Sequence, residues 1–375
     1  MKLTFCVNAE MRDNGTFSLV RQAAKEVMGL PVFGLDGEHL EWLQRGHPIP
    51  EDHKTDMVLF CDDGRDDIPM ELPDAPVKAC WLIDTHLGSD IRVEWAKHFD
   101  FVFCAQTTGV DLMADHGIDA HWLPLACQPR AQPNQSELMQ IREALLAQEA
   151  DPAQRESAQA SLQQIFMGRD LDKEWDVVFV GFMNKGVEGD PESHNRVEYL
   201  DAIFKAYRNS WLVTNCFHEA MAARYVKGRV GMHVSIKNDL AMRWFEIPST
   251  GTAMLANRDV AGWADLGFRD GEHFVGYEGI DEAIEKIRRM LDNPMEREAI
   301  ARQGHEFVRA NHTYAHRMAQ MFGICGIQIE RQDNDQGAEG EGDAGVVEQD
   351  GGTVAPEPER DHSEAEGRVA ESGAG

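Results

Sequence analysis

A carboxylate stands in an unusually apolar stretch of the sequence, NDLAMRWFEIPSTG, which runs from Asn238 to Gly251. Glu246 in this stretch has leucine, methionine, tryptophan, phenylalanine and isoleucine around it. A buried carboxylate is costly unless other groups compensate it. One interpretation is a structural ion pair with Arg243. The other is a set of hydrogen bonds from vicinal hydroxyls, such as those of a ribose.

The same stretch predicts a helix that begins at Asp239. Aspartate is a favourable N-cap residue, because its carboxylate accepts hydrogen bonds from the first amide groups of a helix. A helix N-terminus also offers N–H donors and the positive end of a dipole, which suit a pyrophosphate. We therefore expect Asn238, Asp239 and Arg243 to lie at the anionic part of a ligand, with Arg243 bound either to phosphate or to Glu246.

Two other groups of polar residues follow predicted strands. The loop GFMNKG begins at Gly181 and contains Lys185, which could reach a diphosphate or remain a solvated surface charge. In WLIDTH, Asp84 and His86 stand two residues apart at the end of an apolar run. Such a pair could share a proton and deprotonate the hydroxyl of an acceptor. The alternative is that Asp84 caps the next turn and His86 packs beneath it.

The acidic run DDGRDD, at 62–67, raises the question of a metal site, because hard cations bind several carboxylates. A run of acidic residues around a glycine is more typical of an exposed turn, so we assign no metal site. His305, His312 and His316 have no cysteine or glutamate at a convincing ligand spacing. We interpret them as packing residues or as cations at helix ends.

Short apolar runs that alternate with amphipathic stretches must position these groups. Near-continuous apolar runs are typical of parallel strands that helices cover on both faces. Six such runs lie in the first 126 residues: KLTFCVNA, PVFGL, DMVLFC, KACWLID, FDFVFCA and HWLPLA. The helices between them are predicted at 16–28, 89–97 and 107–116, and the last ends at Gly117.

The pattern resumes in the second half, where strands are predicted at 175–181, 210–215, 229–236, 252–257 and 272–277. Residues 281–322 follow as helices with breaks at Asn293-Pro294 and His312-Thr313. The fold class is therefore α/β, with two Rossmann-like, doubly wound domains that face a cleft, where the carboxyl ends of the strands bind the ligand. The expected boundaries are 1–130, a helical connector at 131–170, 171–305, C-terminal helices at 306–328 and a tail at 329–375.

Charge and composition limit the partners. The 375 residues include 36 Lys and Arg against 65 Asp and Glu, a net charge of −29. This balance argues against nucleic acid and against an anionic membrane surface, because both require many cations on the protein. Residues 331–375 contain thirteen acidic residues and no Leu, Ile, Met, Phe, Trp, Tyr or Cys. We predict that this acidic tail is disordered.

Cysteine usage indicates a reducing compartment. The seven cysteines form no CxxC pair, and an odd number fits no closed set of disulfides. Several lie in strand-like apolar runs, where buried reduced thiols are expected, and we predict a cytoplasmic protein. No stretch approaches 18 apolar residues, so we expect no transmembrane segment.

Several of these segments together resemble one family. MRWFEIPSTGTAML, GWADLGFRDGEHFVGY and ANHTYAHRM are similar to the C-terminal half of the CgeB-like, spore-maturation-type glycosyltransferases. ACWLIDTHLG, FDFVFCAQ and HWLPLA are similar to their N-terminal half. The resemblance covers about residues 55–320, apart from the helical segment 134–170. R-x-F-E followed by H-T-Y-x-x-R is its most specific part.

The resemblance implies a GT-B fold, whose C-terminal domain holds a nucleotide sugar and whose N-terminal domain faces the acceptor. In related retaining enzymes two glutamates eight positions apart serve the donor. Glu246 matches the second, which binds the ribose, whereas Asn238 stands in place of the first. Arg229 and His233 stand where lysine and asparagine are expected. No bound cation is implied as a cofactor.

These implications lead to a functional hypothesis. The protein is expected to be a glycosyltransferase that moves a sugar from a nucleoside-diphosphate donor to a hydroxyl of a glycan, protein, lipid or small molecule. Because Asn238 replaces the expected first glutamate, the alternative is a protein that binds a nucleotide sugar without transferring it. A nucleotide-sugar epimerase can share the same architecture and is a further alternative.

Overall fold

The structure is a computed structural model of the full chain. It describes residues 3–6, 16–28, 32–35, 55–62, 75–85, 89–128, 173–183, 195–214, 218–236 and 239–327. The chain divides into residues 1–329 and 330–375, and every described residue belongs to the first unit. The helical segment expected at 131–170 and the acidic tail lie outside the described residues.

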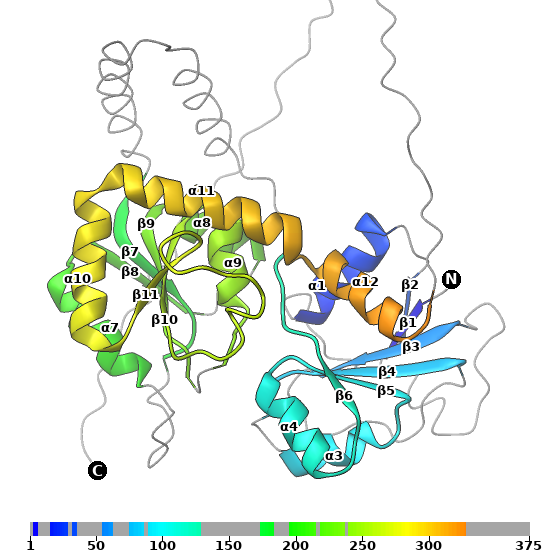
Figure 1. The fold of residues 1–375 in the computed structure, drawn as a ribbon. Coiled ribbons are helices and arrows are strands. Elements are labelled where there is room, and N and C mark those ends of the chain that lie inside the picture. Colours follow the sequence, from blue (N-terminus) through cyan, green and yellow to red (C-terminus); the bar gives the residue numbers. More distant parts are fainter. Residues whose placement is uncertain are drawn as a thin grey trace, which may run out of the picture. The chain divides into compact units, whose positions relative to one another are not determined.

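The N-terminal half forms a parallel sheet of six strands in the order β2-β1-β3-β4-β5-β6 (Figure 1). Its strands are β1 (Leu3–Cys6), β2 (Val32–Leu35), β3 (Met57–Cys61), β4 (Val77–Leu82), β5 (Phe101–Cys104) and β6 (Ala120–Trp122). The helical segments between them are α1 (Thr16–Gln22), the π-helical turn η1 (Ala23–Val27), α3 (Ser89–Ala96) and α4 (Thr107–Asp115). Every residue of β3 is buried, as expected for a central strand covered on both faces.

The C-terminal half forms a parallel sheet of five strands in the order β11-β10-β9-β7-β8. Its strands are β7 (Trp175–Val180), β8 (Ser210–Val213), β9 (Gly228–His233), β10 (Ala253–Asn257) and β11 (Val275–Tyr277). Three helices connect them: α7 (Arg196–Ala206), α8 (His218–Val226) and α9 (Arg243–Ser249). Numbered within this sheet, the order is 2-1-3-4-5, and the N-terminal sheet begins in the same way.

This strand order creates a topological switch point in each sheet. From β7 the chain first moves outward to β8 and then returns to β9 on the other side of β7. The connections on the two sides of β7 therefore diverge, and the carboxyl ends of β7 and β9 lie next to each other. In open α/β sheets such a point is where ligands bind. The equivalent point in the N-terminal sheet lies between β1 and β3.

Three helices close the described chain: α10 (Gly279–Asp292), α11 (Pro294–Asn311) and α12 (Tyr314–Ile324). They break at the two predicted positions. Pro294 occupies the first turn of α11, where its missing N–H costs nothing, and Thr313 and His316 form a capping box at the start of α12. Helix α12 contacts α1 and η1, so the last described helix packs against the N-terminal half.

The two α/β sheets confirm the predicted fold class. The predicted strands match the observed ones closely, except that only residues 120–122 of the HWLPLA region pair as β6. Gly117 follows α4 with a φ of 73°, a conformation that favours glycine and ends the helix as predicted. Helix α11 continues without a break across the boundary that was expected between residues 305 and 306.

Candidate functional site

Two arginines meet the ends of β7 and β9 at the switch point of the C-terminal sheet. Arg243 Nε donates a hydrogen bond to the carbonyl of Val180, the last residue of β7, over 3.0 Å. Arg196 Nε donates to the carbonyl of Val234, just after β9, over 2.6 Å. Arg196 Nη1 also donates to Phe182 O over 3.3 Å. Each guanidinium is thus fixed by a strand end.

Both guanidinium groups bind carbonyls at the end of β7, Arg243 at Val180 and Arg196 at Phe182. Burial and then the charge of Arg243 lower the pKa of Arg196 to about 10. Arg196 remains protonated at neutral pH, so the site carries two neighbouring positive charges. Like charges held together repel each other, and an anion between them would offset that repulsion. The arrangement suits a dianionic group such as a diphosphate.

Glu246 lies beside this pair. It is in the first turn of α9, is only 6% exposed, and its carboxylate is ion-paired with Arg243 through Oε2 and Nη1. The pair is the structural interpretation of Glu246 that the sequence left open. The ion pair uses only part of the hydrogen-bonding capacity of the carboxylate, because an ionised carboxylate can accept about four hydrogen bonds. A ribose hydroxyl could therefore bind the same side chain.

Tyr225, which was not identified from the sequence, contacts the end of β7 that binds Arg243. Its side chain is fully buried, and its hydroxyl lies 3.2 Å from Val180 N, which donates to it. Burial raises the pKa of Tyr225 to about 12, so the phenol stays neutral. The Tyr225 hydroxyl also donates to Val180 O over 3.5 Å, the carbonyl oxygen that accepts from Arg243.

The helix that carries Arg243 and Glu246 begins later than predicted. Its N-cap is Met242 and not Asp239, so the expectation of an aspartate cap was wrong. The reason lies in a preceding turn, in which Ala241 N donates to Asp239 O over 2.9 Å. Ser235 Oγ donates to the same carbonyl over 3.1 Å. These bonds place Asp239 in a turn, and α9 has only seven residues.

The other predicted donor residues fall in two classes. Gly181 follows β7, donates its N–H to Val213 O over 3.0 Å, and lies beside the Arg196 guanidinium. Lys185 and Asn238 lie outside the described residues. The structure thus brings Gly181, Arg243 and Glu246 together and adds Arg196 and Tyr225 to them.

Arg196 carries a signal that sequence reasoning could have used. It is the first residue of α7, after the N-cap Asn195, whose side chain accepts a hydrogen bond from Glu198 N. A cation in the first turn of a helix is unfavourable, because the helix dipole is positive there. An arginine directly after a capping asparagine therefore indicates a compensating role elsewhere.

On the N-terminal sheet, Asp84 follows β4 with a φ of 55°, the one positive φ found at a non-glycine residue in the described parts of the chain. Aspartate tolerates this conformation better than most residues, and such outliers occur often at functional sites. Its predicted partner His86 lies outside the described residues. Asp84 is partly exposed at the carboxyl end of its strand.

Asp62 is the one residue of the acidic run 62–67 that the structure describes, and it forms an ion pair with Arg92. Both side chains are almost fully buried, and Arg92 Nε donates to Asp62 Oδ2 over 2.5 Å. Ile83 N donates to the same oxygen over 3.2 Å. Among the described residues no group of three or more His, Cys, Asp or Glu could hold a metal ion.

The histidines near the C-terminus act as packing residues. His305 Nδ1 bonds to Ser249 O over 2.9 Å, and His312 Nε2 bonds to Leu266 O over 3.1 Å. Burial lowers the pKa of both, and that of His312 to about 3. His316 belongs to the capping box of α12, and burial lowers its pKa as well. They are therefore not cations at neutral pH.

Part of the chain matches a known family. Residues 186–323 match the family described as glycosyl transferase-like. None of the curated proteins matches the sequence. In the described segments no helix has the length and apolar character needed to cross a membrane.

Solved structures resemble the chain in fold. HepE of Anabaena in complex with UDP-glucose is 12% identical, with a TM-score of 0.53. Sucrose-phosphate synthase of Thermosynechococcus elongatus is 11% identical, with a TM-score of 0.52. An alpha-glucosyltransferase in complex with UDP and a 13-mer DNA is 9% identical, with a TM-score of 0.55. Each comparison covers 87% of this chain and 99% of the other. The chain therefore has the two-sheet α/β fold of GT-B glycosyltransferases, and its residues 186–323 match the glycosyl transferase-like family.

Proposed function

We propose that this protein is a glycosyltransferase that uses a nucleoside-diphosphate sugar as its donor. One observation carries the proposal: Arg196 and Arg243 are fixed beside each other at the switch point of the C-terminal sheet, with Glu246 next to them. These three residues lie within the segment that matches the glycosyl transferase-like family. A diphosphate and a ribose are the ligand groups that two cations and a buried carboxylate bind best.

The proposed chemistry follows from these charges. The bond between the anomeric carbon of the sugar and the diphosphate oxygen breaks, and that oxygen leaves with its electron pair. Arg196 and Arg243 stabilise the developing negative charge, so that the sugar carbon can take on positive charge. An acceptor hydroxyl forms the new bond to that carbon and gives up its proton. Gly181, Lys185, Asn238 and Asp239 complete the proposed donor site.

We assign the acceptor proton to Asp84 and His86, on the grounds that Asp84 stands at a strand end with a positive φ. No metal ion is needed in this scheme, because the arginines neutralise the diphosphate. R-x-F-E and H-T-Y-x-x-R support the CgeB-like subtype. Buried thiols without a disulfide at Cys80, Cys104, Cys127 and Cys325 support a cytoplasmic location. The acceptor is a glycan, protein, lipid or small molecule.

Calorimetric titration with UDP and with pyrophosphate tests the donor site. Arg196→Ala should weaken the binding of both ligands by roughly 10–150-fold. This range corresponds to about 1.5–3 kcal/mol, the contribution of a hydrogen bond to a charged group. Glu246→Ala should weaken UDP to a similar extent and leave pyrophosphate almost unchanged, because pyrophosphate has no ribose. Arg288→Ala is the matched control, since Arg288 is an exposed arginine of α10.

The controls define what would contradict the proposal. If Glu246→Ala weakens UDP and pyrophosphate equally, Glu246 acts only as the partner of Arg243. The wild-type protein is titrated with a panel of nucleoside diphosphates and nucleoside-diphosphate sugars that carry different bases. If it binds none of them, the proposed function is wrong. Slow hydrolysis of one nucleotide sugar in the same panel would separate a transferase from a protein that binds the donor without reacting.

A further inference from the structure

A buried asparagine lies at the end of β10, next to the proposed donor site. Asn257 is the last residue of that strand and is almost fully buried. Its Oδ1 accepts a hydrogen bond from Ser235 N over 2.9 Å, and its Nδ2 donates to Asp259 Oδ1 over 2.6 Å. Only the carbonyl oxygen can accept from a backbone N–H and only the amide nitrogen can donate to a carboxylate. The two partners therefore fix the orientation of the side chain.

The peptide group that Asn257 binds is the one that binds Arg196. Ser235 N–H and Val234 C=O belong to the same planar peptide unit, and Arg196 Nε donates to that Val234 oxygen over 2.6 Å. The chain of bonds thus runs from the Asp259 carboxylate through the Asn257 amide and the 234–235 peptide to the Arg196 guanidinium. Because a peptide unit is rigid, a shift at its N–H moves its oxygen as well.

The polarity of the chain is the same at every step. The Asp259 carboxylate draws the Nδ2 protons of Asn257 and makes Oδ1 a stronger acceptor. Oδ1 in turn polarises the peptide and makes the Val234 oxygen more negative towards the guanidinium. Aligned hydrogen bonds of this kind strengthen one another. A negative end at Asp259 and a positive end at Arg196 complete the alignment.

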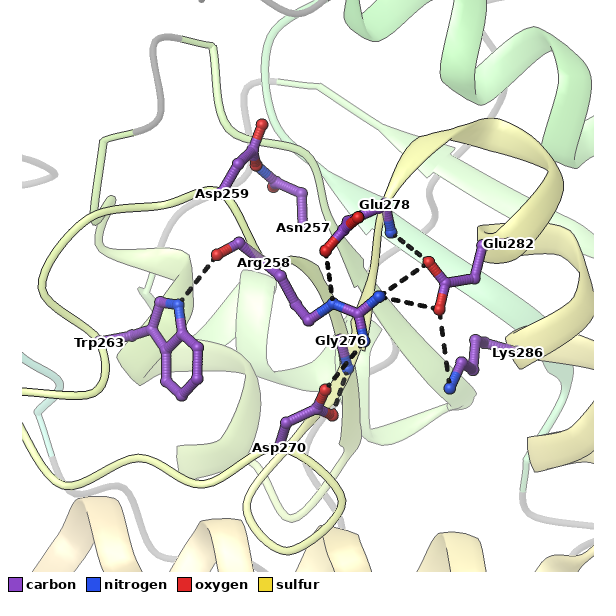
Figure 2. Close-up of polar contacts among 9 residues, drawn as sticks. All are labelled: Asn257, Arg258, Asp259, Trp263, Asp270, Gly276, Glu278, Glu282 and Lys286. Atoms are coloured by element: carbon purple, nitrogen blue, oxygen red, sulfur yellow. Dashed lines mark hydrogen bonds and ion pairs between the residues drawn. The ribbon is translucent and has the colours of Figure 1, made fainter.

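The segment that carries Asn257 and Asp259 is itself held firmly (Figure 2). Arg258, between them, donates its backbone N–H to Tyr277 O over 3.0 Å. Its carbonyl accepts from Trp263 Nε1 over 3.1 Å. Its guanidinium binds both carboxylate oxygens of Glu282 at 3.0 Å and contacts Asp270 and Glu278. Arg258 therefore anchors the start of the chain of bonds.

We propose that Asn257 is a positioning residue of the donor site, which fixes Arg196 through the Val234–Ser235 peptide. The proposal rests on the proposed function for the meaning of Arg196, but the coupling between the two residues can be measured without any ligand. Asn257 would not touch the donor. It would set the direction of the guanidinium that does.

The sharpest test swaps the amide of residue 257 and the carboxylate of residue 259, first in one position and then in both. Asn257→Asp places two carboxylates against each other, so the side chain must turn away and Ser235 N–H loses its acceptor. The double variant Asn257→Asp/Asp259→Asn restores one carboxylate and one amide and keeps the wild-type net charge. Asp259→Asn alone is the matched control, because an asparagine oxygen can still accept from Asn257.

Two measurements are made on each variant: hydrogen–deuterium exchange of peptides covering residues 234–242 without ligand, and calorimetric titration with UDP. Asn257→Asp should speed hydrogen–deuterium exchange in these peptides and weaken UDP binding about tenfold. The double variant should resemble the wild type, and Asp259→Asn, which keeps the hydrogen bond but loses the charge, should change both much less than Asn257→Asp does. In an Arg196→Ala background, Asn257→Asp should weaken UDP no further, because the coupling acts through Arg196. A merely structural role would give an additive loss.

The outcomes separate this inference from the proposed function. Unchanged exchange in Asn257→Asp, no recovery in the double variant, or additive losses with Arg196→Ala would overturn it. If the wild type does not bind UDP, the donor assignment fails, whereas the exchange data still decide whether Asn257 orders the segment. If Asn257→Asp alone does not fold, the test still stands. The double variant Asn257→Asp/Asp259→Asn must then restore both folding and the wild-type rate of hydrogen–deuterium exchange.

Discussion

Arg317 lies over the ring of Phe245, with its guanidinium carbon 5.6 Å from the ring centroid. Arg317 Nη2 also contacts His312 Nδ1 over 3.0 Å, and its Nε donates to Pro124 O over 2.8 Å. Phe245 directly precedes Glu246, whose charge adds to burial in raising the pKa of Tyr314. The H-T-Y-x-x-R motif is therefore packed against the R-x-F-E motif, which stabilises the helix that carries Glu246.

This contact predicts an acid-sensitive fold. Arg317 donates to His312 Nδ1, so the ring proton is on Nε2 and donates to Leu266 O. Burial and the charge of Arg317 lower the pKa of His312 from 6.5 to about 3. At pH values between these two pKa values, His312 of the unfolded chain therefore binds a proton more readily than His312 of the folded protein. Stability should be complete above pH 6.5 and fall as the pH drops towards 3, by up to about 1.4 kcal/mol per pH unit.

Urea unfolding of His312→Gln at several pH values checks this prediction. Glutamine can accept from Arg317 and donate to Leu266 O but does not titrate, so the free energy of unfolding should fall less steeply with acid. His116→Gln is the control, because His116 is exposed on the surface. Equal slopes for wild type and His312→Gln would show that the histidine does not contribute.

A second prediction concerns the stability of the Arg258 cluster. Arg258→Lys replaces a planar fork, which binds both oxygens of Glu282, with a single ammonium group. We expect a loss of about 1–2 kcal/mol in the free energy of unfolding. Arg288→Lys should leave the free energy of unfolding almost unchanged, because the ion pairs of Arg288 are exposed. Similar losses in both variants would mean that the cluster is no more than a surface network.

Gly276 offers an independent test of the same cluster. A Cβ atom at this position would overlap Arg258 Cγ and lie 2.6 Å from Asp270 Oδ2. Gly276→Ala should therefore destabilise the protein, and by less when Arg258 is already alanine. Thermal unfolding of the two single variants and the double variant measures this coupling. Strict additivity would indicate that the arginine stem does not occupy the space beside Gly276.

The sequence predicts the strands well because each is a short, nearly continuous apolar run between polar breaks. It predicts Glu246 for the same reason: a single carboxylate in an apolar helix is visible locally. Arg196 and Asn257 are different, since their roles depend on the Val234–Ser235 peptide, which follows a separate strand, β9. Asp239 was misjudged because the cap rule considers only the next three residues, whereas Ser235 draws it into a turn.

The acidic run that begins at Asp62 should not make the proposed transfer activity dependent on a metal. UDP affinity and sugar transfer should be unchanged after treatment with EDTA, and loss of activity that a divalent cation restores would contradict this. Asp62→Asn should instead lower the free energy of unfolding by about 3–5 kcal/mol, because Arg92 would be left buried without its counter-charge. Chemical denaturation measures this loss.

The last prediction concerns the acceptor side. Asp84 has a φ of 55°, which glycine adopts more readily than aspartate. Asp84→Gly should therefore keep the melting temperature and the UDP affinity of the wild type while it removes the carboxylate. If Asp84 and His86 handle the acceptor proton, Asp84→Gly and His86→Ala should each slow transfer by about 10²–10⁴-fold, the usual range for general acid–base catalysis. Undiminished transfer by a folded Asp84→Gly protein would remove Asp84 from the reaction. A fall in melting temperature and UDP affinity together in His86→Ala would instead mark His86 as a packing residue.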